Sequence, residues 1–216
     1  MARRADTGDH RFPSWLASLG KESEEGEVKE ERQITVFGIF AVNLKSAPIN
    51  VYADFQALLN ASGKWRLIVM VGDSVTSDAV SERLFELAES KVNVDIFYIA
   101  AHGGNGGNGV LLSDKLVSPA WIAKKAEAHQ VSLVILAACR TAKVASALRR
   151  SGVPTVIYMQ RDVKDKDALD MIEPLLNALN SGYTAAAAVD HARSFVDDII
   201  GHSTLHVIGD EDLVIK

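Results

Sequence analysis

The chain has 216 residues, of which 48% are hydrophobic and 24% charged, and its formal net charge is -5. This is the balance of an ordinary globular protein, and it excludes wholesale disorder, coiled-coil and collagen architectures. The length indicates one large domain, with or without an additional arm.

The acidic balance argues against nucleic acid as a direct partner, because binding to a phosphate backbone needs a surplus of Lys and Arg. No apolar run approaches the roughly 18 residues of a membrane span, and the first four residues, Met, Ala, Arg and Arg, lead into polar sequence. We therefore expect a cytoplasmic protein without a membrane partner.

Residues 1–33 differ in composition from the rest of the chain and are predicted to form an acidic, flexible N-terminal arm. Residues 21–32 contain six Glu against two Lys and one Arg. Within the arm, Trp15, Leu16 and Leu19 have helical spacing, so this piece could dock on the body or on a partner. A frayed terminus explains the same residues equally well.

From residue 34 onward, apolar runs of strand length alternate with amphipathic stretches of helix length, which is typical of an α/β domain. The predicted strands are 34–42, 65–71, 94–101, 132–138, 155–159 and 205–208. The predicted helices are 51–60, 77–90, 119–128, 143–151, 165–180 and 184–200. We expect a mostly parallel central sheet of about six strands with helices on both faces. The last of these helices has an apolar face that should pack on the sheet, formed by Ala185, Ala188, Val189, Ala192, Phe195, Val196 and Ile199.

Two reactive side chains follow strands of this predicted sheet. The strand over 94–101 runs into His102 and a loop, 103–109, that contains five glycines; the strand over 132–138 runs into Cys139. The loops at the carboxyl ends of parallel strands commonly carry function. We therefore expect His102 and Cys139 to leave the same edge of the sheet.

A cysteine nucleophile needs thiolate character and an imidazole that manages protons, and these partners need not be adjacent in sequence. Gly103 lets the backbone come close to a substrate carbonyl, so its N–H and that of Cys139 could form an oxyanion hole. The glycines that follow suggest a flexible wall around a substrate channel.

Each of these features has a simpler explanation. The single cysteine, Cys139, excludes an internal disulfide and a multi-cysteine zinc site, and it could be a buried hydrophobe. His102 could cap its strand. The Gly-rich loop could cradle phosphate, although it lacks the glycine spacing and the Lys-Ser/Thr pair of phosphate loops, so no cofactor is expected. No metal is expected either, because none of the other histidines has metal-ligand spacing with a carboxylate: His10, His129, His191, His202 and His206.

Several pieces, taken in order and spacing, resemble a known family. They are a strand ending in Ala-Ala-His-Gly, a return through Val-Leu-Leu-Ser-Asp at 110–114, a strand ending in Leu-Ala-Ala-Cys, and Ser-Gly-Val-Pro-Thr-Val-Ile-Tyr-Met-Gln at 151–160. Together they look like the CHAT domain, a group of caspase-like cysteine peptidases related to caspases, metacaspases, separases and gingipains. The similarity covers about residues 34–214.

The resemblance implies a caspase-hemoglobinase-like three-layer sandwich over residues 34–216. It also implies that Cys139 attacks the scissile carbonyl, that His102 protonates the leaving amine, and that the N–H groups of Gly103 and Cys139 hold the oxyanion. The implied function is a cysteine endopeptidase that cleaves a specific protein partner in a regulated bacterial defence or cell-death pathway.

Caspases place Gln, and metacaspases Asp, two residues before the nucleophile, where this chain has Ala137. The predicted substrate-binding residues are therefore Ala137 itself together with Asp114, Gln160, Arg161 and Asp162. A carboxylate among them would favour Lys or Arg in the substrate, but we expect an uncharged pocket. Residues 140–154 are too few for a helix and a cleavable linker, so an activating protein partner or the ordering of loops is expected to switch the site on.

Two other functions remain open. A catalytically silent caspase-like binding module could recruit a partner through its acidic arm or the segment around Trp15. A flavodoxin-like domain could bind a ligand with its Gly-rich loop.

Overall fold

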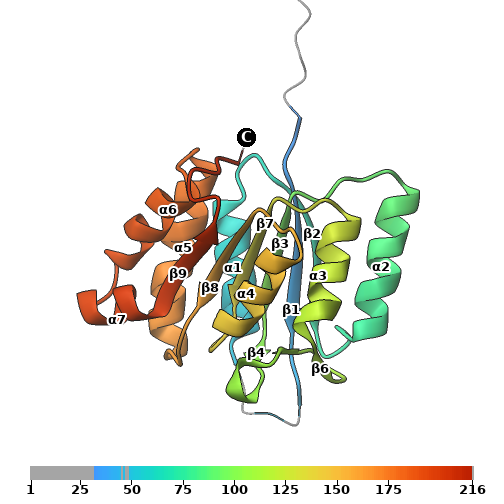
Figure 1. Cartoon of the computed structure of the whole chain (residues 1–216), viewed down its shortest axis with the longest axis horizontal. Helices are drawn as coiled ribbons and strands as arrows, with labels where there is room; N and C mark the ends of the chain where they lie inside the picture. The colour runs from blue at the N-terminus through green and yellow to red at the C-terminus, as the bar shows by residue number, and fades with distance from the viewer. Residues whose placement is uncertain (1–31, 45, 47–48, 216) are drawn as a thin grey trace, which may run out of the picture. The chain divides into compact units, whose positions relative to one another are not determined.

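A six-stranded sheet forms the centre of the computed structural model, which describes residues 32–44, 46 and 49–215 (Figure 1). The strand order is β2-β1-β3-β7-β8-β9; five strands are parallel and β9 runs antiparallel to β8 at one edge. Their bounds are β1 Thr35–Ala41, β2 Arg66–Gly72, β3 Ile96–Ala100, β7 Leu133–Ala137, β8 Thr155–Met159 and β9 Leu205–Gly209. The prediction of a mostly parallel sheet of about six strands is confirmed.

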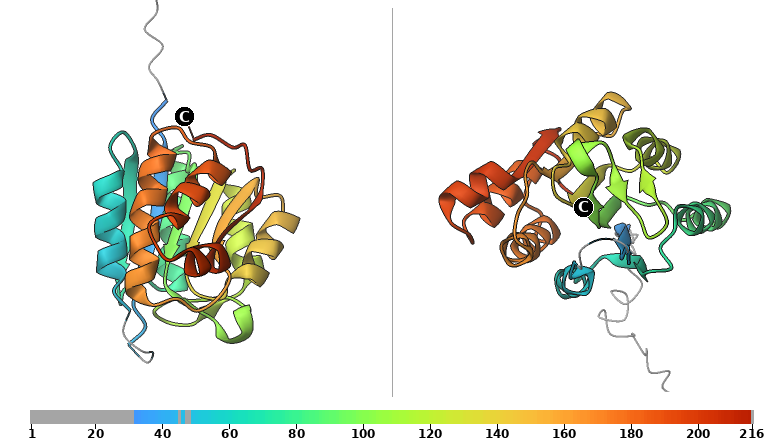
Figure 2. Two further views of the ribbon diagram at one scale, coloured as in Figure 1. Left: turned by 90° about the vertical axis from the view of Figure 1, so that its left-hand side faces the viewer. Right: turned by 90° about the horizontal axis from the view of Figure 1, so that it is seen from below.

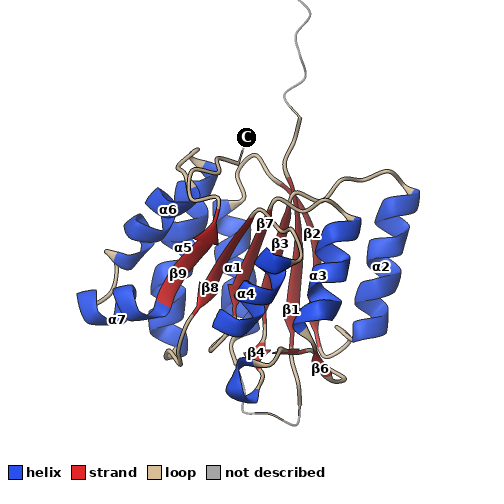
Figure 3. Cartoon of the chain, in the orientation of Figure 1, coloured by secondary structure: helices blue, strands red, loops and turns tan. Residues whose placement is uncertain are grey.

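Helices cover both faces of this sheet, which completes a three-layer sandwich (Figures 2 and 3). One face carries α1 (Val51–Ala61), α5 (Asp165–Asn180) and α6 (Ala185–Arg193); the other carries α2 (Ser77–Glu89), α3 (Pro119–Ala128) and α4 (Ala142–Arg150). None of the helices in the described residues is long and apolar enough to cross a membrane. The predictions for the arm, including Trp15, lie outside the described residues apart from positions 32 and 33.

The central strands are almost entirely apolar because both of their faces are covered. Every residue of β1 and of β3 is buried. In β1, Phe40 packs in the core under α1 and α5, whereas Phe37 packs in the core under α2, α3 and α4. Burying side chains of this size contributes roughly 1.5–3 kcal/mol each, so neither layer of helices is dispensable.

Polar caps fix where the helices begin. The side chain of Asn50 accepts a hydrogen bond from the N–H of Ala53 at the start of α1, and Thr76 and Ser118 do the same for α2 and α3. Such caps satisfy N–H groups that have no partner within the helix. They explain why the starts predicted at residues 51, 77 and 119 are confirmed.

The predicted helix over 184–200 is wrong, because the chain breaks after α6 and resumes as α7 (Asp198–Thr204). The Ser194 hydroxyl donates to the carbonyl of His191 at the break, and the Asp197 side chain accepts from the N–H of Ile199. Local capping therefore outweighs the apolar periodicity. As a result Phe195 and Ile199, predicted to pack on the sheet, are 54% and 74% exposed.

A second, three-stranded sheet at the carboxyl edge was missed. It consists of β4 (His102–Gly103), β5 (Val110–Leu111) and β6 (Leu116–Val117), with a short 3-10 turn, η2 (Asn105–Gly107), between the first two strands. The Gly-rich segment is folded on itself: the N–H of Gly104 donates to Gly109 and that of Gly107 donates to Gly104. Strands of two residues give too short a pattern to detect in sequence.

Candidate active site

His102 and Cys139 stand at the same level of two neighbouring parallel strands. Ala100 at the end of β3 is paired with Ala137 at the end of β7. His102 and Cys139 each follow two residues later, His102 at the start of β4 and Cys139 in the turn that precedes α4. The paired alanines lie on the face of the sheet that is covered by α1 and α5.

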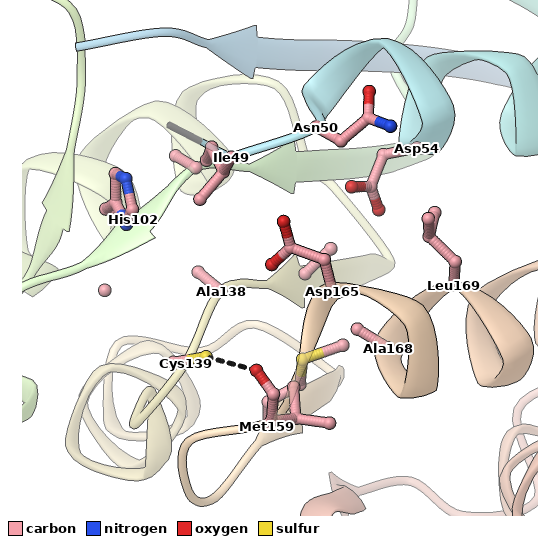
Figure 4. A pocket seen from close by; sticks show the side chains of 14 residues that line it. Ile49, Asn50, Asp54, His102, Ala138, Cys139, Met159, Asp165, Ala168 and Leu169 are labelled. Atoms are coloured by element: carbon pink, nitrogen blue, oxygen red, sulfur yellow. Dashed lines mark hydrogen bonds between the residues drawn. The ribbon is translucent and has the colours of Figure 1, made fainter. Parts of the chain in front are cut away.

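Both residues line one pocket at this edge (Figure 4). The pocket lies between the ends of β3 and β7 and the beginnings of α1 and α5. Its lining is Ile49, Asn50, Asp54, Ala101, His102, Gly103, Ala137, Ala138, Cys139, Met159, Val163, Asp165, Ala168 and Leu169.

Gly103 is required by the close approach of the two chains at this point. A Cβ atom on Gly103 would lie 1.8 Å from the carbonyl oxygen of Cys139, and one on Gly107 would lie 2.5 Å from that of Arg140. Neither contact is possible for a residue with a side chain. The glycines therefore let the segment after His102 lie directly on the backbone of residues 138–141, the turn between β7 and α4 that we call the Cys139 turn.

The Cys139 turn is held against the next strand by Thr141, which sequence reasoning missed. The N–H of Thr141 donates to the carbonyl of Met159 at 2.8 Å, and its fully buried hydroxyl lies 2.9 Å from the carbonyl of Ala138. Arg140, which lies between Cys139 and Thr141, has φ +57°. This is a left-handed conformation that residues with a side chain adopt at some energetic cost. This sharp turn takes the chain from β7 into α4 and leaves the thiol at the pocket.

The thiol of Cys139 is half-buried and turned toward the carbonyl of Val163, with the sulfur 3.9 Å from that oxygen (Figure 4). Burial raises the pKa of Cys139, the carboxylates of Asp162 and Asp165 raise it further, and Arg140 opposes them. The thiol is therefore protonated at neutral pH. Figure 4 places His102, also half-buried, across the pocket from the direction in which the thiol points.

Two carboxylates in the pocket were not predicted. Asp54, in the first turn of α1, is partly buried and accepts a hydrogen bond of 2.9 Å from the hydroxyl of the fully buried Tyr98. Burial raises the pKa of Asp54 to about 6, and the nearby Asp165 contributes in the same direction. The weak signal available in the sequence was an acidic residue in the first turn of α1 and of α5, two helices that follow strands of the sheet.

Of the predicted substrate-binding residues, Ala137 lines the pocket and the others lie elsewhere. Asp114 accepts hydrogen bonds from the N–H and hydroxyl of Ser77, and so holds the start of α2. Asp162 forms an exposed ion pair with Arg140. Gln160 and Arg161 are also exposed, and the N–H of Gln160 donates to Thr204.

Metal ligation has no candidate in the part of the chain that the structure describes, since no three His, Cys, Asp or Glu residues group there as ligands could. The pocket instead offers a thiol, an imidazole, two carboxylates and an apolar wall. These groups suit nucleophilic and acid-base chemistry.

A three-layer α/β sandwich with a cysteine and a histidine at the carboxyl edge of neighbouring strands is the arrangement of the caspase-like class. The family model for the CHAT domain matches residues 26–198. The chain therefore belongs to the CHAT-domain family, which is related to the caspase-like cysteine peptidases. No curated protein matches the sequence.

Proposed function

We propose that this chain is a cysteine endopeptidase in which Cys139 is the nucleophile and His102 the general acid and base. The observation that carries the proposal is that both side chains reach one pocket from the same level of β3 and β7. The contact between Gly103 and the Cys139 backbone supports it, because it keeps the two reactive segments together.

In the proposed reaction, His102 takes the thiol proton as the sulfur of Cys139 attacks the scissile carbonyl. The N–H groups of Gly103 and Cys139 stabilise the resulting oxyanion. His102 then gives its proton to the leaving amine, which leaves a thioester on Cys139. Water hydrolyses the thioester and restores the thiol.

The resting position of the thiol supports a regulated enzyme. A protonated sulfur turned toward Val163 has to rotate toward His102 before it can react. Substrate binding, which orders the loops around the pocket, would supply that change, and an activating protein partner would make it faster. We propose that the substrate is a specific protein partner in a bacterial defence or cell-death pathway.

The same observation favours a second candidate, a catalytically silent binding module. A thiol whose pKa is raised by burial is a poor nucleophile, and such a protein would use the surface around the pocket for recognition alone.

Covalent labelling separates the two candidates. Cys139 is the sole cysteine, so thiol labelling of the intact protein reports on it alone. The purified protein is treated with a mixture of peptide acyloxymethyl ketones and, separately, with iodoacetamide, and the adducts are mapped by mass spectrometry. A peptidase site reacts with the peptide reagents much faster than simple thiol alkylation predicts. A binding module reacts with iodoacetamide only, and that result would reject the endopeptidase.

A further inference from the structure

The two carboxylates of the pocket come from helices that pack against each other on one face of the sheet. Asp54 lies in the first turn of α1 and Asp165 is the first residue of α5. Figure 4 shows both carboxyl groups in the space between these helices and the Cys139 turn. They are separated by more than one hundred residues in the sequence, and the fold brings them to one cavity.

The negative charge of this pair is not balanced within the pocket. No Lys or Arg occurs among the described residues that line it. Asp165 lies close enough to raise the pKa of Asp54 and that of Cys139. A cation bound between the two carboxylates would remove a repulsion that the unliganded pocket contains.

Apart from Asn50, His102 and Cys139, the rest of the lining is apolar. Ile49, Met159, Ala168 and Leu169 form walls beside the two carboxylates. Such a pocket matches a side chain that has a long hydrocarbon stem and a cationic end, because the stem packs against apolar walls while the charge reaches the acids. Lys and Arg are the amino acids with this shape.

We propose that Asp54 and Asp165 select a substrate with Lys or Arg immediately before the cleaved bond. The pocket they line is continuous with Cys139 and His102, so the side chain next to the attacked carbonyl is the one that can enter it. This inference rests on the proposed endopeptidase function, and it replaces the expectation of an uncharged pocket.

Binding of such a substrate would also help to activate the nucleophile. The charge of Asp165 raises the pKa of the Cys139 thiol. A cationic side chain that neutralises this charge lowers the pKa again, so that the thiolate forms more readily when the correct substrate is bound.

Matched electrophiles test the proposal. Two peptide acyloxymethyl ketones differ only in the residue next to the reactive group: Arg in one, and its neutral isostere citrulline in the other. The rate of Cys139 labelling is measured by mass spectrometry in the full chain. We expect the Arg reagent to react at least about tenfold faster, the ratio that one charge-assisted contact of about 1.4 kcal/mol produces.

Variants identify the residues responsible. Asp54→Asn and Asp165→Asn should each lower the Arg/citrulline ratio, and the double variant should bring it close to one. Asp167→Asn is the matched control, because Asp167 lies in the same first turn of α5 without lining the pocket; it should leave the ratio unchanged.

Three results would overturn the inference. Equal rates for the two reagents in the wild type would reject the basic specificity while leaving the endopeptidase intact. An unchanged ratio in the double variant would reject the assignment to Asp54 and Asp165. Alkylation of Cys139 by iodoacetamide without labelling by either peptide reagent would reject the proposed function itself, and this inference with it.

Discussion

Asp54→Asn should stabilise the protein at neutral pH while it weakens substrate selection. The folded state raises the pKa of Asp54 from 3.8 to about 6, so the ionised carboxylate is less favourable in the fold than in the unfolded chain. One pKa unit corresponds to about 1.36 kcal/mol, so the penalty reaches about 3 kcal/mol once both states are ionised. Asn avoids this penalty and still accepts the hydrogen bond from Tyr98.

The size of the effect depends on pH. Below pH 3.8 both the folded and the unfolded wild type carry a protonated Asp54, and the penalty is absent. Between pH 3.8 and about 6 the unfolded chain ionises first, so the stability of the wild type falls as pH rises; above about pH 6 the loss is complete. Asp54→Asn should therefore gain relative stability across this window and hold the gain above it.

Urea denaturation at a series of pH values from 4 to 8 measures the effect. The difference in unfolding free energy between Asp54→Asn and the wild type should be small at pH 4 and approach about 3 kcal/mol at pH 7.5. Asp167→Asn, measured alongside, reports the effect of removing a carboxylate of α5 that does not line the pocket. A difference that is the same at pH 4 and pH 7.5 would refute the electrostatic reasoning.

Three further predictions concern the Cys139 turn. Gly103→Ala should cost about 1–3 kcal/mol of stability and abolish peptide labelling of Cys139, because the new Cβ would meet the carbonyl oxygen of Cys139. Gly106→Ala is the control, because the space around its Cβ is open. In the same denaturation assay it should cost only about 1 kcal/mol, for its positive φ. Thr141→Val should lower stability by about 1–3 kcal/mol by removing a buried hydroxyl donor, and Thr141→Ser should restore most of it. Asp162→Asn should shift the pH profile of Cys139 alkylation by iodoacetamide to lower pH, because this carboxylate raises the pKa of the thiol; an unshifted profile would contradict that cause.

The positions of His102 and Cys139 could be predicted because each follows a long apolar run. Such runs identify buried parallel strands, and the carboxyl ends of parallel strands meet at one edge. The order β3-β7 then brings the two residues together, as the pairing of Ala100 with Ala137 shows.

The acidic side of the pocket could not be predicted in this way. Asp54 and Asp165 come from helices whose neighbourhood on the sheet depends on the strand order, which the sequence pattern does not determine. Asp114 shows the opposite case: it follows a strand end in the sequence, yet its carboxylate is used to hold the start of α2. An acidic residue near a strand end can therefore serve either the site or a helix cap, and only the three-dimensional structure separates the two.

The break between α6 and α7 illustrates a different limit. The apolar positions continue with helical spacing through residue 199, but Ser194 and Asp197 form hydrogen bonds that end one helix and start the next. Short polar residues compete with the helix for backbone groups, and this competition is local enough to override the pattern.

The dependence of Cys139 labelling on His102 tests the central claim most directly. The labelling rate with a peptide acyloxymethyl ketone is compared between the wild type, His102→Ala and the surface control His202→Ala, with iodoacetamide as the reference reagent. General acid-base assistance of the usual size predicts a loss of about 100-fold or more in His102→Ala alone, for the peptide reagent. Equal peptide labelling in all three proteins would contradict a Cys139–His102 peptidase.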